Sequence, residues 1–150
     1  MAEKSVNETT LRITRTFAAP QQKIFDAWTQ AEKLIHWLCR VSAQHKTKIV
    51  ELDLRVGGRY RLEGTTPEGE NYVLSGLYRE IKPPERLVFT WHWETDPSFG
   101  ESLVTVELFA RGASTEMVLT HERFADQTRR DRHAVGWEGC FHQLVGVLGQ

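Results

Sequence analysis

The chain has 150 residues, of which 40% are hydrophobic and 26% are charged, a mixture typical of one globular domain that folds without disulfides or a metal. Nineteen Lys and Arg residues against twenty Asp and Glu residues give a formal net charge of −1. The composition therefore lacks the excess of positive charge that a phosphate-binding surface needs, and we expect no nucleic-acid partner.

The first elements along the chain are a polar segment and a strand. Residues 1–8 are polar, and we expect a flexible N-terminus there, followed by a single domain over residues 9–150. Leu11 and Ile13 alternate with polar residues up to Phe17. This two-residue period predicts a first strand.

Two short helices are predicted after this strand. Pro20 suits the first position of a helix, because its missing N–H would have no partner there. The apolar residues of the first helix share one face at helical spacing: Ile24, Phe25 and Trp28. The second helix has an apolar stripe of its own: Leu34, Ile35 and Leu38.

Residues 46–122 alternate with a period of two and are interrupted five times by turn residues. The interruptions fall at residues 57–58, 67–69, 82–84, 96–100 and 112–114. Connections this short join antiparallel neighbours, since parallel strands need a long crossover. The pattern predicts six strands in a meander and, with the first strand, a seven-stranded antiparallel sheet that has one apolar face.

A long amphipathic helix is predicted at the C-terminus, where it covers the apolar face of the sheet. Thr128 and Asp131 have the spacing of a capping box. The apolar residues that follow form one arc: Ala134, Trp137, Phe141, Leu144, Val145 and Leu148. Glycines lie on the other side of this helix, where another backbone can approach closely: Gly136, Gly139 and Gly146.

The order of elements resembles the α+β helix-grip fold of the START and birch-pollen-allergen superfamily, also called SRPBCC. Several motifs, in the same order, are similar to those of the bacterial family named after the activator of the heat-shock protein 90 ATPase. They include Phe17-Ala18-Ala19-Pro20, Ala27-Trp28-Thr29, Asp53-Leu54-Arg55-Val56-Gly57-Gly58 and Thr120-His121-Glu122, with residues 76–81, 83–91, 103–108 and 136–137. The resemblance covers residues 11–148 and implies a ligand space between the long helix and the sheet. The family name implies a chaperone as a partner.

Ten residues are expected around that space, most of them aromatic. They are Trp37, Tyr60, Gly76, Tyr78, Phe89, Trp91, Trp93, His121, Trp137 and Phe141. Such walls suit a small hydrophobic or aromatic molecule, because rings offer a large contact area and a few polar tips. The alternative is that the same rings simply fill the core.

Three functions are therefore open. The first is a noncatalytic binding module for a small hydrophobic or aromatic molecule. The second is an enzyme of cyclase, lyase or hydrolase type, in which His121 acts as acid or base and Tyr60 or Tyr78 orients the substrate; the competing interpretation of His121 is a hydrogen-bonded core histidine. The third is an interaction protein that contacts the chaperone.

No cofactor and no metal are expected. The histidines are scattered, and His133 and His142 lie on opposite sides of the last helix, so they cannot share a metal ion. Cys39 and Cys140 belong to no paired-cysteine motif, which is typical of a reducing compartment. With no apolar run of about 18 residues and no signal peptide, we expect a cytoplasmic protein without a membrane span. The sequence leaves the oligomeric state open.

Overall fold

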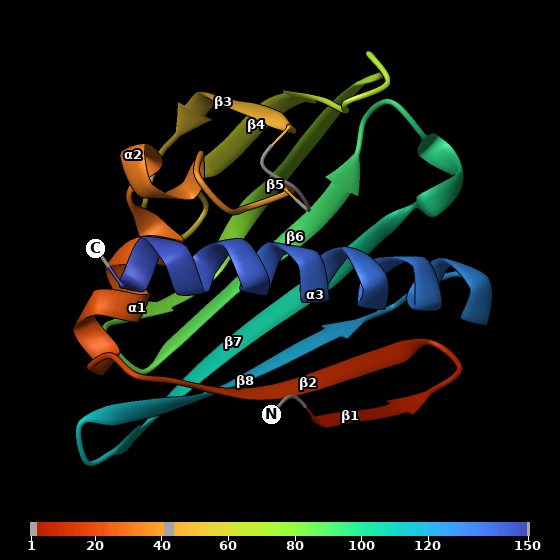
Figure 1. Ribbon diagram of the computed structural model, residues 1–150. Helices are drawn as coiled ribbons and strands as arrows, with labels where there is room; N and C mark the ends of the chain where they lie inside the picture. Colours follow the sequence, from red (N-terminus) through yellow and green to blue (C-terminus); the bar gives the residue numbers. More distant parts are fainter. Residues whose placement is uncertain (1–2, 41–43, 150) are drawn as a thin grey trace.

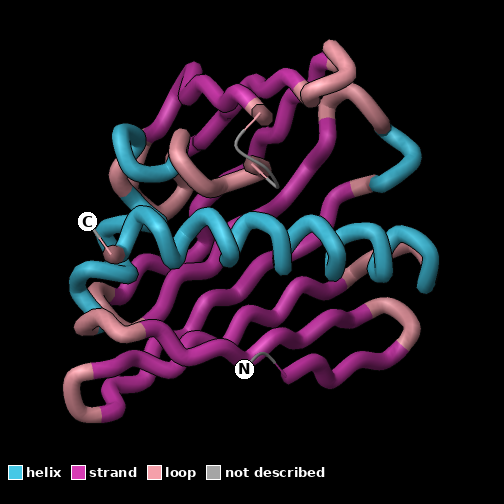
Figure 2. The backbone as a smooth tube through the Cα atoms, viewed as in Figure 1, coloured by secondary structure: helices cyan, strands magenta, loops and turns pink. Residues whose placement is uncertain are grey.

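The computed structural model of the protein describes residues 3–40 and 44–149. A curved antiparallel sheet lies behind one long helix that runs across its concave face (Figure 1). Short helical segments lie beside the C-terminal end of that helix (Figure 2). The hydrophobic core is formed by side chains from both the sheet and the helices.

Over the described residues the sheet has eight strands, all antiparallel to their neighbours. They are β1 (Glu3–Asn7), β2 (Thr10–Phe17), β3 (Lys46–Leu52), β4 (Arg59–Thr65), β5 (Asn71–Lys82), β6 (Arg86–Trp93), β7 (Glu101–Arg111) and β8 (Ser114–Glu122). Their order across the sheet is β1-β2-β8-β7-β6-β5-β4-β3. Strands β3 to β8 form a meander, and β2 returns to pair with β8.

The seven predicted strands are confirmed as β2 to β8, and β1 adds an eighth at the edge of the sheet. The sequence predicts a flexible tail over residues 1–8, but residues 3–7 pair with β2. A local turn explains the pairing: the backbone N–H of Thr9 donates to the Asn7 side-chain oxygen at 3.0 Å. An Asn at this position closes a tight turn with its own side chain and returns the chain along β2.

The helical segments are α1 (Gln21–Thr29), α2 (Ala31–Leu34), the 3-10 turn η1 (Pro97–Phe99) and α3 (Gln127–Leu148). Both predicted short helices are present, but α2 ends at Leu34, so Ile35 and Leu38 of its predicted stripe lie in the turns that follow. Pro20 is the N-cap of α1, one residue before the predicted position. The helix-start prediction for α3 was wrong: Asp126 is the N-cap, and its carboxylate accepts the Arg129 backbone N–H at 2.8 Å. Thr128 already lies within the first turn, so it cannot cap the helix.

The buried face of α3 forms the centre of the core together with the inward side chains of the sheet. The predicted arc is buried, with Cys140 as a further member, but Val145 is 46% exposed. Val145 lies at the margin of the arc, beside buried Leu144 and Leu148, where the helix surface turns away from the sheet. The predicted close backbone approach is absent at Gly136 and Gly146, because a Cβ atom at either position would meet nothing within 4 Å.

Candidate functional site

The ten residues predicted to surround the ligand space separate into two groups. Trp91, Trp93 and Trp137 line a cavity of about 450 Å³. The other seven do not line it and lie elsewhere between helix and sheet: Trp37, Tyr60, Gly76, Tyr78, Phe89, His121 and Phe141.

Most of the second group forms a closed cluster of rings near α1 and α2. Trp28 meets Trp37 edge to face, with 4.6 Å between ring centroids, and Tyr60 meets Phe89 in the same way at 5.6 Å. Trp37 and Phe141 have no exposed surface. The indole N–H of Trp37 donates to the carbonyl of Ala27 at 3.0 Å. These rings fill the core, as the alternative interpretation predicts.

Gly76 serves this packing and not the cavity. A Cβ atom at Gly76 would lie 2.0 Å from the carbonyl oxygen of Thr90 and 2.6 Å from the Tyr60 ring. The same Thr90 oxygen accepts the Tyr60 hydroxyl at 2.5 Å. Glycine is therefore required, because the Thr90 carbonyl and the Tyr60 ring both lie too close to leave room for a side chain.

His121 is part of a satisfied hydrogen-bond chain inside the core. The indole N–H of Trp137 donates to its Nδ1 at 3.0 Å, and its Nε2 lies 2.7 Å from the Ser102 hydroxyl. Because an indole N–H only donates, His121 carries its proton on Nε2, and Ser102 passes the chain to the carbonyl of Trp91 at 3.3 Å. The pKa of His121 lies well below its usual value, mainly because the ring is buried and to a smaller extent because of the charge of His133.

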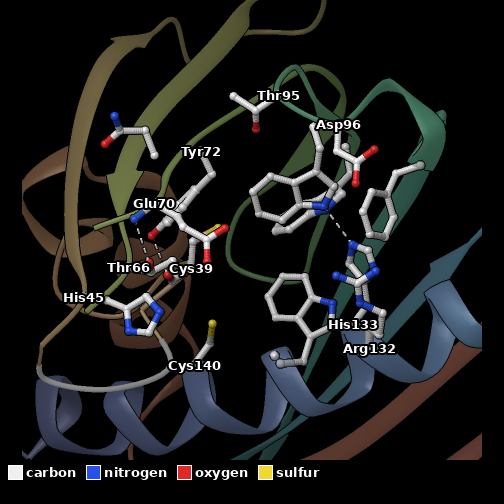
Figure 3. Close-up of a pocket in the computed structure, with 16 residues that line it drawn as sticks. Cys39, His45, Thr66, Glu70, Tyr72, Thr95, Asp96, Arg132, His133 and Cys140 are labelled. Atoms are coloured by element: carbon white, nitrogen blue, oxygen red, sulfur yellow. Dashed lines mark hydrogen bonds between the residues drawn. The ribbon is translucent and has the colours of Figure 1, made fainter. Parts of the chain in front are cut away.

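The open cavity is bounded on one side by α3, from Arg132 to Cys140 (Figure 3), and Trp91 and Trp137 form part of its wall. Its walls come from segments far apart in the sequence, and its mouth carries exposed polar residues. The lining is Cys39, His45, Thr66, Glu70, Asn71, Tyr72, Trp91, Trp93, Thr95, Asp96, Phe99, Arg132, His133, Gly136, Trp137 and Cys140.

Aromatic contacts hold the walls of this cavity in place. Trp91 from β6 lies 5.0 Å from Trp137 of α3 and 5.6 Å from Trp93, measured between ring centroids. Tyr72 from β5 meets Trp93 edge to face at 5.8 Å, and its hydroxyl donates to the Cys39 carbonyl at 2.8 Å. The rings are thus positioned by both strands and by the segment after α2.

His133 connects the wall of the cavity to α3. Its Nε2 accepts the indole N–H of Trp93 at 2.8 Å, and its Nδ1 lies 2.8 Å from the carbonyl of Arg129, to which it donates. Burial and the nearby Arg132 lower the pKa of His133, although the Arg129 carbonyl acts in the opposite direction. A neutral His133 suits this arrangement, since it must accept a hydrogen bond from Trp93.

The mouth of the cavity combines both signs of charge with an aromatic side chain. Phe99 of η1 lies under the guanidinium groups of Arg129 and Arg132, at 5.5 and 5.3 Å from its ring centroid. Glu70 and Asp96 also line the cavity. A ligand with an aromatic body and a polar end could therefore contact the rings inside the cavity and the charged side chains at its mouth.

Several lining residues were missed by the sequence analysis. Tyr72 could have been found, because it alternates with Leu74 and Gly76 on the inward face of its strand. Gly136 lines the cavity although the helical pattern places it on the far side of α3. Cys39 gives no signal, because its position depends on the chain path after α2.

The described part of the chain shows no group of three or more His, Cys, Asp or Glu residues that could hold a metal ion. Within the same residues, no helix has the length and hydropathy required to cross a membrane.

The comparisons agree on fold and family. The family model described as "Activator of Hsp90 ATPase homolog 1-like protein" matches residues 18–149, and the chain belongs to this family. No curated protein matches the chain.

Solved structures share the same architecture. Protein CV1439 from Chromobacterium violaceum is 24% identical over 95% of this chain and 98% of its own, with a TM-score of 0.86. A Rhodobacter sphaeroides protein is 26% identical over 99% of both chains, with a TM-score of 0.83. The predicted helix-grip fold is confirmed by these similarities.

Proposed function

We propose that this member of the Hsp90 ATPase activator homologue family is a binding protein for a small hydrophobic or aromatic molecule. The observation that carries the proposal is the cavity of about 450 Å³ bounded by Trp91, Trp93 and Trp137. Its volume lies within the roughly 300–1,000 Å³ typical of small-molecule sites.

The chemistry of the lining favours a planar guest with a polar end. Indole and phenol rings offer flat apolar surface. Hydrogen bonds hold Tyr72, Trp93 and Trp137 in place. Trp91 is held by its contacts with neighbouring rings, so little order has to be created on binding. Arg132, Glu70 and Asp96 at the mouth offer charged or polar contacts to the part of the guest that stays near solvent.

Gly136 provides a direct test, because a side chain there would enter the cavity without strain. Its Cβ would meet nothing within 4 Å. We expect 8-anilinonaphthalene-1-sulfonate to bind the wild-type protein and to quench tryptophan fluorescence. Gly136→Leu should weaken binding by about tenfold or more, equivalent to about 1.4 kcal/mol.

Gly146→Leu is the matched control. Gly146 lies ten residues further along α3, and its Cβ would also meet nothing within 4 Å. It does not line this cavity but a separate pocket beside α1 and α2. This variant should bind the probe as the wild type does. Equal binding by Gly136→Leu and wild type, with both folded by circular dichroism, would contradict the proposal.

The geometry does not favour the enzyme hypothesis based on His121. The ring has no exposed surface, both nitrogens are hydrogen-bonded, and the residue does not line the cavity. A general acid or base must reach the proton it transfers. Tyr60 and Tyr78 are also buried, and burial raises the pKa of both hydroxyls.

A chaperone-binding role is a second candidate, favoured by exposed apolar side chains around β3 to β5. These are Val50, Leu54, Val56 and Leu77, which are 40–67% exposed. A contiguous apolar patch marks a protein contact surface, and these four side chains are the candidates for one. If they form one, purified Hsp90 should hydrolyse ATP faster with the wild-type protein than with Val56→Asp. No stimulation by the wild type would remove this candidate.

A further inference from the structure

A second pocket, of about 510 Å³, lies where α1 and α2 meet the C-terminal end of α3 (Figure 1). It shares no lining residue with the tryptophan-lined cavity. Its lining is Lys23, Ala27, Lys33, His36, Arg40, Gln143, Gly146, Val147 and Leu148. Of these nine described residues three are Lys or Arg and none is Asp or Glu, so the pocket is basic although the chain has a formal net charge of −1.

The segment around α2 presents basic side chains to this pocket while its apolar side chains anchor it in the core. Lys33 and His36 are three residues apart, an interval at which side chains share one face of a helical turn. The turns continue past the end of α2, since the backbone N–H of Leu38 donates to the carbonyl of Leu34 at 2.9 Å. Both leucines are buried. Arg40 follows directly after these turns and lines the same pocket.

Lys23 of α1 connects the pocket to the end of α3. Its Nζ donates to the carbonyl of Leu148 at 2.6 Å, which is one of the last four carbonyls of the helix and has no partner within it. This contact offsets the partial negative charge that a helix carries at its C-terminal end. An ammonium group has three N–H donors, so two are left after this bond.

The charge and the shape of the pocket both favour an anionic occupant. Lys23 and Lys33 are half-buried, and no carboxylate among the described lining residues neutralises them. Positive charge around a concave space attracts anions. A phosphate group fits such a site better than a carboxylate, because it carries a charge of about −1.5 to −2 and three strong acceptor oxygens.

We propose that this pocket binds a small soluble phosphate compound, with Lys23, Lys33 and Arg40 in contact with the phosphate. A volume of about 510 Å³ is typical of small-molecule sites and exceeds that of a phosphate group alone. Ala27 and Val147 form an apolar side, so a small organic group can accompany the phosphate. This site is additional to the proposed binding of a hydrophobic or aromatic molecule and does not depend on it.

Inorganic pyrophosphate tests the site, because it has phosphate charge and no apolar group for the tryptophan-lined cavity. We expect one pyrophosphate to bind per full-length chain in calorimetric titrations at low ionic strength. Lys33→Gln should weaken binding by about tenfold or more, because charge-assisted hydrogen bonds are the strong ones. Lys48→Gln is the matched control: it removes the same charge from an exposed position on β3 outside the pocket and should bind nearly as the wild type does.

The two glycines of α3 separate this site from the proposed function. A side chain at Gly146 would enter the basic pocket, since its Cβ would meet nothing within 4 Å. Gly146→Leu should therefore weaken pyrophosphate binding by about tenfold or more, whereas Gly136→Leu should leave it unchanged. The naphthalene probe should show the reverse pattern, so the failure of one site is distinguishable from the failure of the other.

Chemical-shift mapping on the wild type keeps the test decisive if a variant fails to fold. Pyrophosphate should shift the amide signals of residues 33–40 and 143–149. Shifts confined to residues 129–137 would place the anion beside Arg129 and Arg132 and overturn the inference. Equal weakening by Lys33→Gln and Lys48→Gln would also overturn it, because that result shows a general effect of charge. So would binding to phosphatidylglycerol vesicles without binding of soluble pyrophosphate, which would assign the basic residues to a lipid surface.

Discussion

The two halves of the interface between α3 and the sheet use similar side chains for different purposes. Near α1 and α2, Trp28, Trp37 and Phe141 interlock and exclude solvent. Towards the N-terminus of α3, Trp91 and Trp93 leave a cavity of about 450 Å³. A short helical pair covers the first half, whereas Gly136 and the turn η1 border the second. Aromatic content therefore does not create a pocket by itself; this cavity lies where a glycine and the turn η1 border the rings.

The largest expected loss of stability is in the half near α1 and α2, where the rings are closely packed. Phe141→Ala removes a ring with no exposed surface, and the surrounding rings cannot collapse into the space. We expect a loss of about 3–5 kcal/mol in the free energy of unfolding by urea titration. Trp93→Ala, at the border of the cavity and partly exposed, should cost clearly less. Equal losses would mean that the two halves are packed alike.

Replacing a glycine by alanine should change the stability of the protein in opposite directions in the two halves. Gly76→Ala places a methyl group 2.0 Å from the Thr90 carbonyl oxygen, so the backbone of two paired strands must move. We expect a loss of about 1–3 kcal/mol. Gly136→Ala meets nothing within 4 Å and should stabilise the helix by up to about 1 kcal/mol. Thermal unfolding of both variants measures this difference, and destabilisation by Gly136→Ala would contradict the open geometry.

Most of the fold could be predicted because it depends on local periodicity. Two-residue alternation located seven strands, and the helical arc on α3 identified the side that meets the sheet. The errors lie where a single side chain determines where a strand or helix begins or ends. Asn7 closes the turn between β1 and β2, and Asp126 caps the N-terminus of α3. A pattern of hydrophobic residues contains no information on such single hydrogen bonds.

The candidate site was predictable only in part. The two-residue alternation correctly predicted that Trp91 and Trp93 face α3. It could not distinguish a ring that packs into the core from a ring that lines a cavity. That distinction depends on which segments cover each ring in three dimensions. Cys39 and Phe99 reach the cavity through the segment after α2 and the turn η1, whose paths no periodic pattern describes.

His121 lies in the core and does not line the cavity. Its burial should make the stability of the protein depend on pH. Its pKa is lowered in the folded protein, whereas an unfolded histidine has a pKa of about 6.5. Between these values the unfolded chain binds more protons, so stability falls as pH decreases, by at most about 1.4 kcal/mol per pH unit for this group. His133 adds to the effect in the same direction.

Urea titrations between pH 7 and pH 5 measure this dependence. The slope should decrease in His121→Gln, whose amide cannot titrate, whatever the variant loses in stability at pH 7. His142→Gln changes an exposed residue on α3 and serves as the control. An unchanged slope in His121→Gln would show that the core histidine becomes protonated in the folded state and that the core is accessible to water.

The smallest expected effect concerns the helix that both halves share. Asp126→Ala removes the carboxylate that accepts the Arg129 N–H and leaves a donor of the first turn without its partner. We expect a decrease of a few degrees in Tm, and none for Thr128→Ala, since Thr128 is exposed within that turn.

The half that contains the cavity should be affected first, because residues 132–137 of the cavity wall begin less than two turns after the cap. Weaker binding of the naphthalene probe in Asp126→Ala, with an unchanged near-ultraviolet signal from the packed tryptophans, would show that the cap stabilises the cavity and not the core. The opposite result would show that α3 unfolds as one unit with both halves.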